Sequence, residues 1–295
     1  MELSLPHKSA TFDFAYWRHL TFLDLCCGTI KDIMPLSKQL NHIKELRLYI
    51  QDTDDKGLGE ASPDKSTLAE LTKFHVECSS TKAKAYSCLF GAIDLPILQE
   101  LTLSQTHYDA PADIARAFKR TSACLFGKSL IDLLSSPLHA ASLQVLVIDR
   151  VLISEQTLIA CLAVCRDIAE LSITVGSQGY PFISTHFPDA LIIKSGSGLA
   201  ASLQKFSLSR SQGTIPRNIR YLVQDMVDSR LEKRTHVRRI RAAYLDHHDI
   251  MRGREPESDS EEETTGADED QGGDEGESSS GEEESEEEGG TTMDD

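Results

Sequence analysis

Two groups of side chains in the sequence are of the types that bind metal ions. Cys161 and Cys165 are four residues apart, so on a helix their sulfur atoms would share a face and could form half of a zinc site. Residues 246–249 read Asp-His-His-Asp, which are also metal-ligand types. Neither group has a second ligand pair at a suitable spacing, so we expect no metal and interpret 246–249 as a polar linker.

No nucleophile–base pair and no pair of carboxylates stands out along the chain, although such groups can also meet only in the fold. We therefore expect no catalytic residue, no cofactor and no enzymatic activity.

The seven cysteines form no paired framework, and we expect them to be small buried hydrophobes in a reducing, intracellular compartment. Glu2, Pro6 and Lys8 interrupt any signal-peptide core, and no apolar run of about 18 residues is present. We expect a cytoplasmic or nuclear protein that has no membrane partner.

Charge divides the chain into two parts. Residues 255–295 hold 20 of the 47 acidic side chains and no Lys or Arg, which leaves 27 acidic and 30 basic residues in 1–254. The acidic tail cannot bury enough apolar surface to fold, so we expect it to be disordered. Five tail serines stand among carboxylates and are candidates for an acid-directed kinase: Ser258, Ser260, Ser279, Ser280 and Ser285.

A basic patch precedes the tail. Its members are Lys233, Arg234, Arg238, Arg239 and Arg241. We consider a solvated helix face, a nuclear-import patch and a polyanion-binding stripe. Nucleic acid is disfavoured because the neighbouring tail would compete for the same cations.

One apolar pattern recurs through the rest of the chain, with large residues at the first, fourth and sixth positions. Its seven copies are Leu20/Leu23/Leu25, Ile43/Leu46/Leu48, Leu71/Phe74/Val76, Leu98/Leu101/Leu103, Leu143/Leu146/Ile148, Ile168/Leu171/Ile173 and Leu203/Phe206/Leu208. The steps between copies are 23, 28, 27, 45, 25 and 35 residues. Such spacing predicts an α/β leucine-rich-repeat solenoid with irregular repeats, a curved parallel sheet and helices on its convex side.

We expect four segments: an N-terminal cap at 1–19, the solenoid at 20–215, a helical and basic segment at 216–254, and the tail at 255–295. Helices are expected near 85–93, at 129–135, after the N-cap residue Ser154, and over 216–241 in two pieces. The apolar run 191–193 is a candidate degenerate strand.

By strand alternation, the residues between the inner apolar positions point outward and form a concave binding face. The charged and aromatic candidates for binding a partner are Asp24, Glu45, Arg47, Tyr49, Lys73, His75, Glu77, Glu100, Asp149, Glu170 and Lys205. Arg47 and Tyr49 are the expected energetic centre, since Arg and Tyr are common anchors of protein interfaces.

The irregular repeats, the segment Leu222-Val-Gln-Asp-Met-Val-Asp-Ser-Arg230 and the strand-like stretch 239–245 together resemble the repeat portion of fungal F-box/leucine-rich-repeat proteins. The resemblance covers roughly residues 15–250. It implies the substrate-binding half of a receptor of a cullin-type ubiquitin ligase. The F-box itself is not visible, because Leu5-Pro6-His7-Lys8 is followed by no apolar three-helix pattern, so a Skp1-type adaptor is a doubtful partner.

The acidic tail supports an alternative class. The chain also resembles acidic leucine-rich nuclear phosphoproteins, which implies binding of histones or other basic proteins. The long repeats, in which no Asn follows the last inner apolar residue by three positions, favour the F-box-type hypothesis.

Overall fold

The computed structural model describes residues 2–4, 19–27, 40–50, 65–78, 84–106, 122–135, 142–151, 153–176, 183–193, 198–231 and 237–251. The chain divides into two units, 1–254 and 255–295, and every described residue lies in the first. The N-terminal cap lies almost wholly outside the described residues, and the acidic tail with its five candidate serines lies wholly outside them.

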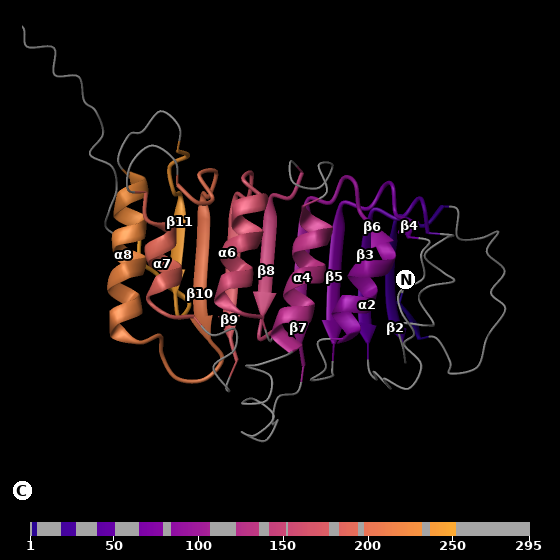
Figure 1. The fold of residues 1–295 in the computed structure, drawn as a ribbon, viewed down its shortest axis with the longest axis horizontal. Helices are drawn as coiled ribbons and strands as arrows, with labels where there is room; N and C mark the ends of the chain where they lie inside the picture. The colour runs from indigo at the N-terminus through magenta and orange to yellow at the C-terminus, as the bar shows by residue number, and fades with distance from the viewer. Residues whose placement is uncertain are drawn as a thin grey trace, which may run out of the picture. The chain divides into compact units, whose positions relative to one another are not determined.

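The first unit is a mixed α/β structure built on one large, mostly parallel sheet, as the repeat pattern predicts (Figure 1). Its ten strands follow the order of the chain: β1 (Glu2–Ser4), β2 (Phe22–Cys27), β3 (Glu45–Ile50), β5 (Lys73–Cys78), β7 (Glu100–Gln105), β8 (Val145–Asp149), β9 (Glu170–Val175), β10 (Lys205–Arg210), β11 (Ala242–Leu245) and β12 (His248–Asp249). Only the last pair, β11 and β12, is antiparallel. Two further short strands, β4 (Ser66–Thr67) and β6 (Ile93–Asp94), pair with each other.

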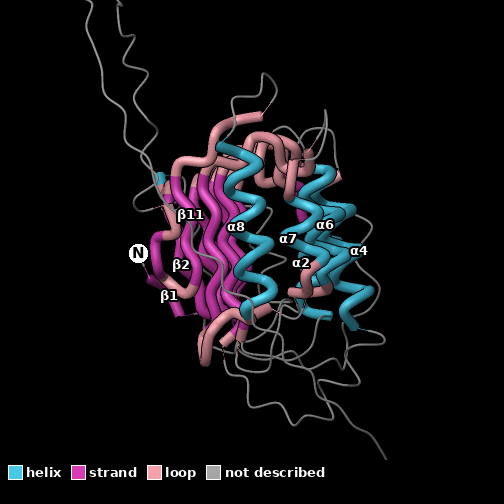
Figure 2. The backbone as a smooth tube through the Cα atoms, turned by 90° about the vertical axis from the view of Figure 1, so that its left-hand side faces the viewer, coloured by secondary structure: helices cyan, strands magenta, loops and turns pink. Residues whose placement is uncertain are grey.

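The five described helices lie on one face of this sheet, while the opposite face carries none of them (Figure 2). They are α2 (Lys84–Ala92), α4 (Ser122–Leu134), α6 (Glu155–Val164), α7 (His186–Leu191) and α8 (Arg217–Leu231). Each helix packs against the next one in this series. We call the helix-free side the open face.

The recurring apolar residues form the core between the sheet and the helices. In the strand register, Leu23, Leu46, Phe74 and Leu101 are successive neighbours, and so are the residues two positions further along each strand. All these side chains are at most 1% exposed. The predicted stacking of the copies in neighbouring parallel strands is therefore confirmed.

The backbone hydrogen bonds repeat with the same period as the apolar side chains. Before each strand, one carbonyl accepts the N–H groups of two successive residues that lead into the next strand, as Thr21 does from Lys44 and Glu45. The same pair of hydrogen bonds to one carbonyl recurs at the carbonyls of Lys44, Thr72, Gln99, Gln144, Ala169 and Gln204. The Gln204 carbonyl binds the segment before β11, which reveals an eighth copy of the apolar pattern at Ile240, Ala243 and Leu245. The segment 216–254 thus adds helix α8 and strands β11 and β12 to the same unit.

Two local predictions were wrong. The apolar run 191–193 is not a strand; Leu191 ends helix α7 and packs in the core. The helix expected over 216–241 ends at Leu231 as described, and residues 238–241 run extended into β11. The apolar residues Ile219, Val223, Met226 and Val227 of α8 are buried, whereas Ile240 belongs to the strand pattern.

Helix α6 begins as predicted, because the Ser154 hydroxyl accepts the Thr157 N–H at 3.2 Å. Its first residue, Glu155, then caps the next helix. The Glu155 carboxylate accepts hydrogen bonds from the backbone N–H groups of Ser184 (3.0 Å) and Phe187 (2.9 Å), at the start of α7. Thr185, the N-cap residue of α7, makes no such bond with its own side chain. One buried carboxylate therefore fixes two successive helices.

Candidate interaction face of the sheet

The outward strand residues form three rows across the open face, since parallel strands in register place equivalent residues side by side about 4.8 Å apart. The first row contains Glu45, Lys73, Glu100, Val145, Glu170 and Lys205; the second contains Asp24, Arg47, His75, Thr102 and Val147; the third contains Cys26, Tyr49, Glu77, Ser104 and Asp149. Except for Ser104, these residues are half-buried or exposed. All eleven predicted binding candidates therefore lie on this face.

Ion pairs join neighbours in the first row. Lys73 Nζ lies 3.1 Å from Glu100 Oε2, and Lys205 Nζ lies 2.6 Å from Glu170 Oε1. These pairs link adjacent strands, which is the geometry in which opposite charges stabilise a sheet. Their side chains are partly exposed, so each pair contributes up to about 1 kcal/mol.

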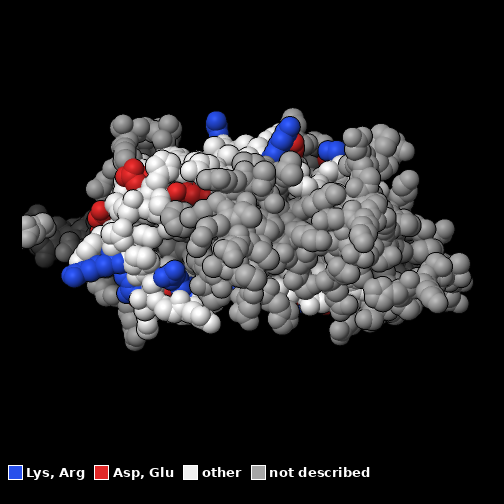
Figure 3. Space-filling view, turned by 60° about the horizontal axis from the view of Figure 1, so that its bottom comes forward, with Lys and Arg blue, Asp and Glu red and all other residues white. Residues whose placement is uncertain are grey.

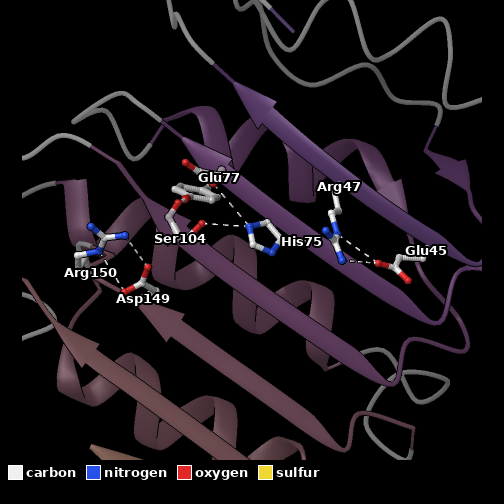
Figure 4. Close-up of polar contacts among 8 residues, drawn as sticks. Glu45, Arg47, His75, Glu77, Ser104, Asp149 and Arg150 are labelled. Carbon is white, nitrogen blue, oxygen red and sulfur yellow. Dashed lines mark hydrogen bonds and ion pairs between the residues drawn. The ribbon is translucent and has the colours of Figure 1, made fainter. Parts of the chain in front are cut away.

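Arg47 is held by two neighbours. Its Nη2 donates to Glu45 Oε1 at 2.9 Å (Figure 4). Its guanidinium lies 5.2 Å from the centre of the Phe22 ring. Sequence alone paired Arg47 with Tyr49, but the contacts of the described residues connect it to Glu45 and Phe22. Arg47 is still an oriented anchor, because contacts with Glu45 and Phe22 hold its guanidinium group before a partner binds.

A polar cluster lies at the centre of the described part of the face, at the ends of β5, β7 and β8. His75 Nε2 lies 3.2 Å from Ser104 Oγ and 3.8 Å from Glu77 Oε2 (Figure 4). Burial lowers the pKa of His75 below its ordinary value, an effect opposed by Glu77 and strengthened by Arg47. Hydroxyl and carboxylate both approach the same ring nitrogen, whereas a serine–histidine–acid relay has them on opposite nitrogens.

Two members of this cluster were not among the predicted binding candidates. Ser104 is an outward residue that is only 5% exposed, and the buried Tyr86 hydroxyl donates to its carbonyl at 2.6 Å. Arg150 follows β8 with a left-handed φ of 59° and binds Asp149 through Nε (3.1 Å) and Nη2 (2.8 Å). Arg150 lies just past the strand, where alternation makes no prediction.

The basic patch is not a helix face as far as it is described. Arg238, Arg239 and Arg241 are exposed in an extended segment, in which the N–H groups of Arg238 and Arg241 bond to Ala201 and Gln204. Lys233 and Arg234 lie outside the described residues. Figure 3 shows side chains of both charge signs among the described residues at the lower end of Figure 1, without a continuous patch of either sign.

Residues 246–249 form a hairpin turn instead of a linker. Asp246 and His247 both have positive φ, of 47° and 67°, as a tight two-residue turn between antiparallel strands requires. Asp246 Oδ2 accepts from Arg220 Nη2 at 2.5 Å and from the Ile215 N–H at 2.9 Å. The carboxylate is thus used to hold α8 against the hairpin.

Cys161 and Cys165 are free thiols packed in the core, and burial raises the pKa of Cys165 to about 12. Among the described residues, no three His, Cys, Asp or Glu side chains gather as a metal site would require. No helix in the described ranges is both long and apolar enough to cross a membrane.

No protein-family model matches the chain, and a search of curated proteins found no match either.

Proposed function

We propose that the first unit is a leucine-rich-repeat solenoid whose open face recognises another protein, similar to the substrate-binding half of an F-box receptor, and that the protein is not an enzyme. The observation that supports this most is the open face itself. It presents outward polar and aromatic side chains in register, several of them fixed by ion pairs, with no described helix over them. Fixed side chains lose little conformational entropy when a partner binds.

Affinity capture from cells tests this proposal. The tagged full chain is compared with Arg47→Glu, which places a negative charge beside Glu45 on the open face, and with Lys128→Glu, the same charge change at an exposed position on α4. We expect Arg47→Glu to lose specific partners that Lys128→Glu keeps, with both variants melting close to the original protein. Identical partner lists for all three would refute recognition through this face.

The composition of the captured proteins separates two candidate functions. Recovery of Skp1-type adaptor and cullin subunits supports the ubiquitin-ligase receptor. The 20 acidic side chains of residues 255–295 favour the second candidate, an acidic-tailed nuclear protein that binds histones. Histone recovery that survives Arg47→Glu and is lost when residues 255–295 are removed supports this alternative.

A further inference from the structure

The charges of the open face do not balance. Across strands β2 to β10 it carries six carboxylates, Asp24, Glu45, Glu77, Glu100, Asp149 and Glu170, and four cations if Arg150 at its edge is included. Each cation is matched to one carboxylate: Arg47 to Glu45, Lys73 to Glu100, Arg150 to Asp149 and Lys205 to Glu170. Neither Asp24 nor Glu77 forms an ion pair with a Lys or Arg among the described residues, although Arg47 is the register partner of Asp24 and Arg150 attracts Glu77 at longer range.

His75 does not neutralise Glu77 at neutral pH. The two side chains are 3.8 Å apart, but burial favours the uncharged imidazole. The Glu77 side chain is only 29% exposed, so its negative charge is poorly hydrated and gains more from an incoming cation than a fully exposed carboxylate would.

An aromatic residue stands between the two unmatched carboxylates. Tyr49 on β3 is the register partner of Glu77 on β5, while Asp24 on β2 lies diagonally opposite Tyr49. Diagonal and direct neighbours on one face of a sheet are about 5–8 Å apart, within the reach of one side chain. Carboxylates next to an aromatic ring suit a cation, which pairs with the charges and lies on the ring.

We propose that the open face binds an extended segment of a partner protein that places a Lys or Arg side chain beside Tyr49, between Asp24 and Glu77. This inference rests on the proposed function and specifies the chemistry of the partner. Val145 and Val147 on β8, three strands away from Tyr49 across the sheet, give the face an uncharged, aliphatic strip on which an apolar side chain further along the same segment packs.

The test uses a phage-displayed library of random peptides of about ten residues, each able to span roughly 33 Å when extended. The library is first depleted on the full-length double variant Asp24→Asn/Glu77→Gln and then selected on the unmodified full-length chain. Because both proteins carry the same acidic tail, the depletion step removes peptides that bind the tail.

We expect the remaining peptides to be enriched in Lys or Arg. Their affinity should fall about threefold to fivefold with Asp24→Asn or with Glu77→Gln alone, the range for partly exposed charge pairs. The matched control Asp225→Asn, at an exposed position on α8, should leave affinity unchanged. Circular dichroism and thermal melting of each variant verify that the fold is retained.

Other outcomes would overturn this inference, and they distinguish its failure from a failure of the proposed function. A parallel selection without the depletion step completes the test: if it yields acidic or uncharged peptides, with affinities lowered by Arg47→Glu but not by Asp24→Asn or Glu77→Gln, the face binds proteins of different chemistry. Failure to select any peptide sensitive to Arg47→Glu, Asp24→Asn or Glu77→Gln would contradict both the inference and the use of this face.

Discussion

Arg230 Nη2 donates a hydrogen bond to the carbonyl of Leu191 at 2.9 Å, which joins the last turn of α8 to the last residue of α7. The same guanidinium also bonds to the carbonyls of Leu199 (2.8 Å) and Ala200 (2.9 Å). Arg230 is 1% exposed, and burial lowers its pKa to about 10, so it is still charged at neutral pH. The segment Met226–Arg230, which carried much of the family resemblance, thus has a structural role.

Replacement of Arg230 should strongly destabilise the fold. Arg230→Ala leaves three carbonyls without their donor, two of them in buried hydrogen bonds, and opens a cavity, so we expect a loss of at least about 3 kcal/mol in the free energy of unfolding. Arg230→Met should lose less, because it fills the space and removes a buried charge. Urea unfolding measures both values. Equal stability of Arg230→Ala and the original protein would contradict the role assigned to these bonds.

Glu155→Ala should loosen α7 in particular. The substitution removes the acceptor for the Ser184 and Phe187 N–H groups, a capping effect of about 1–2 kcal/mol. Glu155→Gln keeps one oxygen acceptor and should lose less. Hydrogen exchange of the α7 amides is the measurement, with the amides of α2 as the internal reference. Uniformly faster exchange in both helices would point to a global effect instead.

Close helix packing depends on Gly127 in α4. A Cβ atom at this position would overlap Thr157 Oγ1 and lie 3.0 Å from Thr157 Cγ2, and Thr157 is itself held by Ser154. We expect overpacking in Gly127→Ala to cost about 1–3 kcal/mol, partly offset by about 1 kcal/mol of helix propensity.

The double variant Gly127→Ala/Thr157→Ala provides the control. Removal of the Thr157 side-chain atoms makes room for the new methyl group, so the two substitutions should be non-additive by about 1 kcal/mol in denaturant unfolding. Strict additivity would mean that the two helices are not in the close contact described.

Protonation of His75 should weaken the fold. Asp24 on β2, Arg47 on β3, Glu77 on β5, Ser104 on β7 and Asp149 on β8 surround the ring, and burial makes the net shift of its pKa downward. Below the ordinary pKa of about 6.5, the unfolded chain therefore binds more protons at this position than the folded chain.

The stability that neutral His75 contributes is thus fully present above about pH 6.5 and decreases as the pH falls below that value. Between about pH 7.5 and about pH 5.5, the melting temperature of His75→Gln should fall less than that of the original protein. His248→Gln, at the exposed strand β12, is the matched control and should behave like the original protein. Parallel pH profiles for all three would contradict this assignment.

Sequence reasoning predicted the sheet well because each repeat buries the same three positions, and the period survives differences in loop length. The stretch 239–245 was predicted to be strand-like, but it was not counted as an eighth copy because Ala243 occupies a position that Leu or Phe fills elsewhere. The run at Leu191 was misassigned because a short, continuous apolar stretch does not distinguish a strand from the end of a buried helix.

The candidate site was only half predictable. Alternation identified which side chains face outward, since this follows from backbone geometry alone. It could not identify which charges neutralise each other, because Lys73 and Glu100 meet through pairing of strands separated by a helix. The unmatched state of Asp24 and Glu77 therefore emerges only in three dimensions.

The hairpin of β11 and β12 has a consequence for how molecules of this protein meet in solution. A row of unpaired backbone N–H and C=O groups at the edge of a sheet can pair with a strand from a second molecule. Here the polypeptide reverses direction at Asp246 and His247 and lays only two residues along that edge. A strand from a second molecule can pair with only two residues at this edge, so the hairpin disfavours end-to-end polymerisation through the C-terminal edge of the sheet.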